Sequence, residues 1–131
     1  MNQLSARQLL VVAIFGLVGW ALCGAIMFIG MEVASMETTL ITHAVGAPII
    51  FTTISWIYFT RFGYTKPLPT AIVFVAIVVL VDFFLVALVI NQSLEMFESL
   101  IGTWIPWALI FLSTYLTGLV VESRSARMRE A

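Results

Sequence analysis

Four long apolar runs dominate the chain, and short polar segments separate them. The runs cover residues 9–30, 39–62, 69–90 and 100–122. Each run is long enough to cross a hydrocarbon layer of roughly 30 Å at about 1.5 Å per helical residue. The pattern predicts an all-α, polytopic membrane protein, with one domain over residues 1–131 and four transmembrane helices arranged as two hairpins.

Local signals refine the ends and contacts of these helices. Ser5 is placed to cap a helix that begins near Ala6, because its oxygen can accept the first unpaired backbone N–H groups. Gly63 predicts the end of the second helix, and Pro69 is a favourable residue for the first turn of the third. Small residues recur along the first helix, and they allow helix backbones to approach closely in a membrane. They form two strips, one with Ala13, Gly16 and Gly19 and the other with Ala21, Gly24 and Ala25.

The composition agrees with burial in lipid. Hydrophobic residues make up 62% of the chain and charged residues 10%, with a mean hydropathy of +1.11. Soluble domains carry about a quarter charged residues, so water is a poor solvent for this surface. The short polar segments leave no room for a separate soluble domain.

The basic residues are all confined to one side of the predicted bundle. All six basic residues lie at the ends of the chain or between the second and third helices: Arg7, Arg61, Lys66, Arg124, Arg127 and Arg129. The other two connections carry only acids: Glu32, Glu37, Glu95 and Glu98. The positive-inside rule therefore predicts a multi-pass protein of a bacterial-type inner (plasma) membrane, with both termini and the middle connection cytoplasmic.

Two ionisable side chains interrupt the apolar runs. His43 is the single histidine of the chain, and Asp82 is the one acid well inside any run. An ionisable group in a membrane span is costly unless it faces a partner, water or the bundle interior, so both are candidate functional residues. Counted from the predicted helix ends, Asp82 lies about 12 Å deep and His43 about 6 Å deep, a difference that helix tilt or one water can bridge.

As a pair, His43 and Asp82 would bind a cation or exchange a proton near neutral pH, with Thr42 and Thr39 lining the approach. The second run is the most polar of the four and is therefore expected to line any cavity. The alternative is structural. In that interpretation each group is satisfied by hydroxyls or backbone carbonyls, and Asp82 by a threonine or tryptophan donor on a neighbouring helix.

A stripe of soft ligands follows the outer half of the first helix. Cys23, Met27 and Met31 are spaced four residues apart and so share one face. Thiolate and thioether groups suit Cu(I), which makes this stripe a candidate metal site. Ordinary packing is the competing interpretation, because methionine fills gaps and no histidine pair or CxxC motif accompanies the stripe.

Other classes of function have little support in the sequence. No HExxH, GxSxG or P-loop motif is present, so we expect no enzyme and no cofactor. Nucleic-acid binding is not expected either, since no basic motif for it occurs. Two tryptophans near the start of the fourth helix, Trp104 and Trp107, are typical of an aromatic belt at the membrane surface.

Two functions remain as hypotheses. The first is a small transporter, channel or transport subunit that binds or relays a proton or cation through His43 and Asp82. The second is a non-catalytic accessory or structural subunit of a larger membrane complex. Four helices enclose little volume, so in either case we expect a homo-oligomer or a partner membrane protein in the bilayer.

Overall fold

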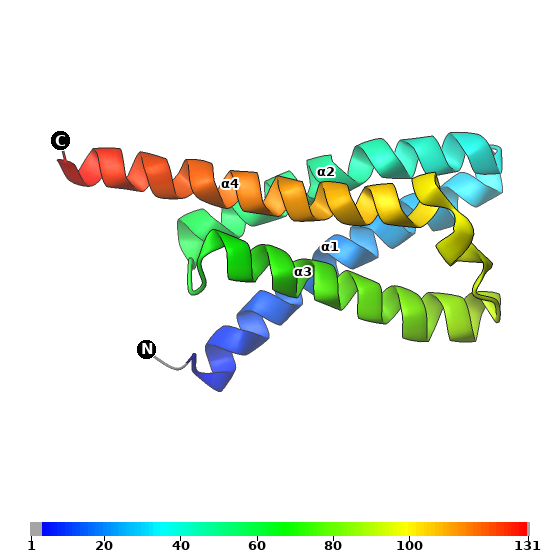
Figure 1. Ribbon diagram of the computed structural model, residues 1–131, viewed down its shortest axis with the longest axis horizontal. Helices are drawn as coiled ribbons and strands as arrows, with labels where there is room; N and C mark the ends of the chain where they lie inside the picture. Colours follow the sequence, from blue (N-terminus) through cyan, green and yellow to red (C-terminus); the bar gives the residue numbers. More distant parts are fainter. Residues whose placement is uncertain (1–3, 131) are drawn as a thin grey trace.

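A computed structural model describes residues 4–130 as an assembly of four long helices (Figure 1). The elements follow one another as α1 (Ala6–Val33), α2 (Met36–Arg61), α3 (Pro67–Val81), η1 (Asp82–Asn91), η2 (Glu95–Glu98), η3 (Leu100–Trp104) and α4 (Ile105–Glu130). Both η1 and η3 are π-helical, and η2 is a 3₁₀ turn. Because η1 continues α3, the third long helix runs from Pro67 to Asn91.

The prediction of an all-helical protein with four helices long and apolar enough to span a membrane is confirmed. The largest difference from the predicted bounds lies in the fourth helix. We expected it to end near residue 122, but α4 continues to Glu130. The polar tail supplies good helix formers such as alanine, methionine and arginine. Two of its basic residues, Arg127 and Arg129, lie in the last turn, where their positive charges interact favourably with the negative end of the helix dipole.

Polar contacts define the predicted helix ends. The Gln8 N–H donates to Ser5 Oγ over 3.2 Å, and the Ser5 N–H donates to Gln8 Oε1 over 3.0 Å, which forms a capping box at the start of α1. α2 ends at Arg61, and Gly63, two residues later, has a φ of 60° in the left-handed region. The Gly63 N–H donates to the Tyr58 carbonyl over 2.9 Å. α3 begins at Pro67, two residues earlier than expected.

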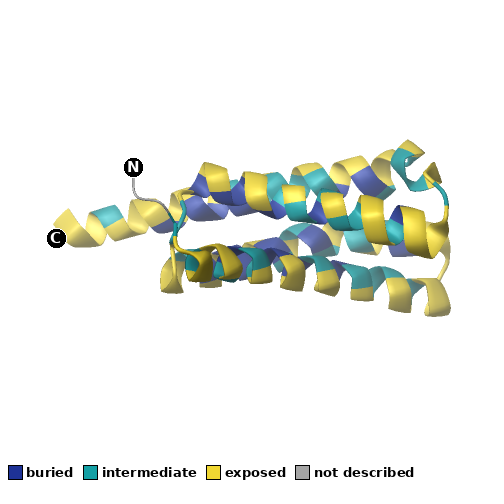
Figure 2. Ribbon diagram, turned by 90° about the horizontal axis from the view of Figure 1, so that it is seen from below, coloured by how far each residue is buried: buried dark blue, intermediate teal, exposed yellow. Residues whose placement is uncertain are grey.

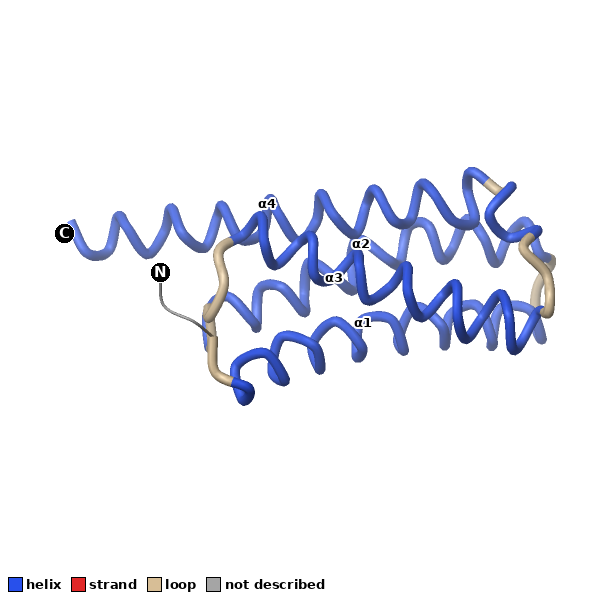
Figure 3. Tube along the Cα trace, turned by 60° about the horizontal axis from the view of Figure 1, so that its bottom comes forward, coloured by secondary structure: helices blue, strands red, loops and turns tan. Residues whose placement is uncertain are grey.

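The four helices pack as a ring. α1 contacts α2 and α3, and α4 contacts the same two helices, so the cyclic order is α1, α2, α4, α3. The α1–α2 and α3–α4 connections lie at one end of the molecule, and the α2–α3 connection lies at the other (Figures 1 and 3). The basic residues therefore gather at the end that holds the α2–α3 connection and the start of α1.

Apolar side chains lie both outside and inside the bundle. Those on the outside include Phe28, Ile90 and Leu100, which are 70%, 65% and 66% exposed. Figure 2 shows exposed residues along the outward faces of the helices. Six hydroxyl-bearing residues are buried beside an apolar core: Thr39, Ser55, Thr70, Thr103, Thr114 and Thr117. A surface of this kind is stable against lipid tails, which do not force apolar groups inward.

The two small-residue strips of α1 differ in their contacts. Gly16 and Gly19 are buried, and a Cβ atom on Gly19 would lie 2.5 Å from the Phe51 ring of α2. A Cβ atom on Gly24 would meet nothing within 4 Å. Close helix approach thus uses the strip with Gly16 and Gly19, and at Gly24 the second strip leaves open space.

A buried tyrosine fixes the connection between α2 and α3. The Tyr58 hydroxyl is fully buried and accepts a hydrogen bond from the Thr65 N–H over 3.1 Å. It also lies 2.8 Å from Thr65 Oγ1, which in turn bonds the Thr70 hydroxyl. Thr70 Oγ1 donates to the Lys66 carbonyl over 2.7 Å. This chain of hydroxyls provides hydrogen-bond partners for the buried polar groups of the α2–α3 connection.

Replacing Tyr58 with phenylalanine will lower the free energy of unfolding by about 1–2 kcal/mol, because the Thr65 N–H and hydroxyl lose their buried partner. The measurement is reversible unfolding of the detergent-solubilised protein. The matched control is Tyr115→Phe in α4, where the ring stacks on Phe111. That change should stay within about 0.5 kcal/mol. Equal losses for the two variants would show that the hydroxyl network does not stabilise the connection.

Candidate functional site

Asp82 is held between two tryptophans from two other helices. Trp20 Nε1 of α1 donates to Asp82 Oδ1 over 2.8 Å, and Trp107 Nε1 of α4 donates to Asp82 Oδ2 over 3.0 Å. These indoles lie 62 and 25 positions away in the sequence. The carboxyl group of Asp82 therefore links α1, the third long helix and α4 at one point. We call these three residues the indole clamp.

The backbone around the clamp changes its hydrogen-bonding pattern. α3 ends at Val81, and the π-helix η1 begins at Asp82. The Asp82 N–H contacts both the Val78 and the Val79 carbonyls, as expected where one pattern gives way to another. Short π-helical segments occur frequently at functional sites, where the wider turn redirects a side chain.

The Trp107 ring is fixed by aromatic neighbours as well as by its hydrogen bond. Its centroid lies 5.1 Å from that of Trp104 and 5.9 Å from that of Phe97. Edge-to-face and tilted contacts at such distances are favourable for aromatic pairs. These packed rings hold the Trp107 side of the clamp in place.

The clamp suits an ionised carboxylate. Each carboxylate oxygen only accepts hydrogen bonds, and each indole N–H only donates. Two charge-assisted bonds compensate much of the cost of removing the carboxylate from water. A protonated Asp82 would carry an O–H donor between two indole N–H groups that also donate. One of the two hydrogen bonds would then be weakened.

His43 does not take part in the clamp. Its Nδ1 atom is buried and has no hydrogen-bond partner among residues 4–130. His43 and Asp82 are both partly buried. Within residues 4–130, Asp82 bonds the two indoles, and no hydrogen bond or ion pair joins it to His43.

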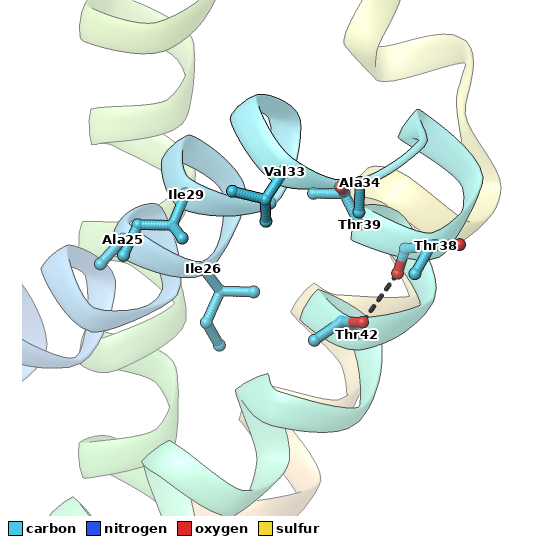
Figure 4. Close-up of a pocket in the computed structure, with 9 residues that line it drawn as sticks. Ala25, Ile26, Ile29, Val33, Ala34, Thr38, Thr39 and Thr42 are labelled. Atoms are coloured by element: carbon cyan, nitrogen blue, oxygen red, sulfur yellow. Dashed lines mark hydrogen bonds between the residues drawn. The ribbon is translucent and has the colours of Figure 1, made fainter.

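Thr39 and Thr42 line a groove between α1 and α2, next to the connection that joins these two helices (Figure 4). The groove has a volume of about 390 Å³, and its other walls are mostly apolar side chains of α1 such as Ile26 and Ile29. The Thr39 hydroxyl donates to the Ser35 carbonyl over 2.8 Å, and the Thr42 hydroxyl donates to the Thr38 carbonyl over 2.8 Å. Each hydroxyl can still accept a hydrogen bond from a molecule in the groove.

The soft-ligand stripe of α1 runs from the core to the surface. Cys23 is buried, with 4% of its area exposed, whereas Met31 is 49% exposed. Met27 lies between them and is half-buried. Across the described part of the chain, no group of three or more His, Cys, Asp or Glu side chains is arranged to hold a metal ion. The stripe remains a sequence-based hypothesis.

Trp20 was not among the predicted site residues, and Trp107 was expected in the aromatic belt. Trp104, the last residue of η3, is exposed, and its indole donates to the Phe97 carbonyl over 2.8 Å. Trp107 instead reaches inward to Asp82. One available signal was that an indole removed from water needs an acceptor, and Asp82 is the single carboxylate well inside an apolar run.

Comparisons with protein-family models, curated proteins and solved structures found no match to this chain.

Proposed function

We propose that the chain is a small transport protein, or transport subunit, in which Asp82 binds a proton or cation. In this proposal it lies in a bacterial-type inner membrane as two helical hairpins, α1–α2 and α3–α4. Both termini and the basic α2–α3 connection face the cytoplasm, and the acidic connections face outward. The charge separation between the two ends of the bundle supports this orientation.

The observation that carries the proposal is the indole clamp. Among residues 4–130, Asp82 is the one titratable group that bonds side chains from two neighbouring helices. Proton binding turns an acceptor-only carboxylate into a group with one donor, so one indole bond is lost or lengthened. Occupancy of Asp82 would therefore change how tightly α1 and α4 are held to the third helix, and such coupling is what a transport cycle needs.

His43 and the groove residues have secondary roles in this proposal. His43 offers a second titratable group on α2, and its unpartnered Nδ1 leaves room for a proton or a water. Thr39 and Thr42 line the groove at the outer end. The four outer glutamates, Glu32, Glu37, Glu95 and Glu98, would raise the local concentration of cations.

A second candidate is a non-catalytic accessory subunit of a larger membrane complex. The observation in its favour is that the indoles satisfy both oxygens of Asp82 within the chain, as a structural link between helices would require. In this case the apolar outer surface packs against a partner membrane protein or further copies of the chain, as well as against lipid.

The test is proton flux into proteoliposomes under an imposed membrane potential. The wild-type protein should admit protons, and Asp82→Asn should reduce the rate at least tenfold while the helical content and oligomer size stay unchanged. Glu95→Gln is the control, because it makes the same change from acid to amide outside the apolar runs. Wild-type flux in a natively folded Asp82→Asn variant would refute the proposed site. Absence of flux from the wild type, together with a stoichiometric copurifying membrane protein, would favour the accessory subunit.

A further inference from the structure

A cavity of about 410 Å³ lies at the basic end of the molecule, far from the indole clamp. The α2–α3 connection forms one side of it and the last turns of α4 form the other. Its floor is apolar and includes Phe59 and Val121, and its rim carries Lys66 and Arg129. We propose that this cavity binds the phosphate group of an anionic phospholipid, with Lys66 and Arg129 as its two cationic ligands.

The two cations reach the cavity from different elements. Lys66 belongs to the α2–α3 connection, and Arg129 lies near the end of α4. Ser125, one helical turn before Arg129, lines the same cavity. Ammonium, guanidinium and hydroxyl groups together match the acceptor oxygens of a phosphate diester. A cation on each side favours one bound headgroup over a diffuse layer of lipid.

The Lys66 side of the cavity is preorganised. Tyr58 and Thr70 hold Thr65 and the Lys66 carbonyl through the hydroxyl chain described above. Lys66 is also the N-cap residue of α3, so the positive end of the α3 dipole lies beside it. Its side chain is exposed, and its ammonium group makes no hydrogen bond or ion pair within residues 4–130.

The apolar floor selects a lipid over a free phosphate ion. Phe59, Pro67 and Val121 offer no hydrogen bonds but suit the glycerol and upper acyl carbons of a phospholipid. Under the orientation proposed above this end meets the cytoplasmic leaflet, where anionic lipids attract basic groups. Glu122 is the carboxylate among the lining residues and opposes binding of an anion, so the two cations must outweigh it.

The experiment is a lipid titration of the full chain in neutral detergent, followed by thermal unfolding. Phosphatidylglycerol should raise the midpoint temperature of thermal unfolding of the wild-type protein, whereas phosphatidylcholine and inorganic phosphate should not. The double variant Lys66→Gln/Arg129→Gln should bind phosphatidylglycerol about tenfold or more weakly, as expected for the loss of two interfacial cations. Arg7→Gln/Arg127→Gln is the matched control, since it removes two charges outside the cavity lining.

Two further variants separate lost binding from lost folding. Lys66→Arg/Arg129→Lys keeps both charges and should bind within about threefold of the wild type. Glu122→Gln removes the opposing carboxylate and should tighten binding, a gain that misfolding cannot produce. Equal losses in the two glutamine pairs would overturn the proposal in favour of diffuse attraction. An equal midpoint shift with phosphatidylcholine or with inorganic phosphate alone would overturn it as well.

Discussion

Replacing Trp20 and Trp107 together with phenylalanine will lower the free energy of unfolding by about 3 kcal/mol or more. We expect no larger loss from any other pair of substitutions that keeps both aromatic rings. Both substitutions keep an aromatic ring in place, so little packing is lost. What disappears is the pair of donors at 2.8 and 3.0 Å from the Asp82 carboxylate. A carboxylate left inside the bundle without partners bears nearly the full cost of its removal from water.

The matched control for this experiment is Trp104→Phe. Trp104 also donates a 2.8 Å hydrogen bond, but its acceptor is the neutral Phe97 carbonyl and its ring is 51% exposed. The expected loss is below about 1 kcal/mol. Adding Asp82→Leu to the double variant should recover at least half of the lost stability, because no buried charge then remains. If the triple variant is no more stable than the double, the loss comes from packing and not from the carboxylate.

Gly19→Ala will destabilise the protein by roughly 1–3 kcal/mol, while Gly24→Ala, five positions away in the same helix, will leave its stability unchanged or raise it. A methyl group on Gly19 would lie 2.5 and 2.7 Å from ring atoms of Phe51, which is fully buried and cannot swing aside. Around Gly24 the space is open, so the better helix propensity of alanine is the main effect there.

The two alanine variants differ in position alone, so unfolding in detergent compares them directly. Phe51→Leu in the Gly19→Ala background offers a further check, since a smaller side chain should relieve the clash and recover part of the loss. Similar stability for Gly19→Ala and Gly24→Ala would mean that α1 and α2 do not approach as closely as described.

The helices could be predicted because a bilayer imposes a strict requirement on its spanning segments. Backbone polar groups in hydrocarbon must bond within the segment, so each long apolar run had to become a helix. The extension of α4 to Glu130 was missed, since its charged residues resemble a solvated tail even though most of them favour helix. The π-helical turns were missed too, because apolar periodicity does not reveal whether an N–H reaches the fourth or the fifth preceding carbonyl.

Asp82 could be singled out from the sequence, and a tryptophan donor on a neighbouring helix was one of its expected partners, but which tryptophans would bind it could not be predicted. A lone acid among valines and phenylalanines is evident from polarity alone. Finding Trp20 and Trp107 requires the rotation of each helix about its axis and the identity of its neighbours. The expected contact with His43 depended on depths counted from uncertain helix ends, and depth says nothing about which side of α2 a residue occupies.

The ring order of the helices gives Asp82 a mechanical consequence. α1 and α4 occupy opposite corners of the ring, and both contact the third helix. Rotation of the third helix about its own axis would carry the Asp82 carboxylate toward one indole and away from the other. The two hydrogen bonds to Asp82 therefore oppose rotation in either direction.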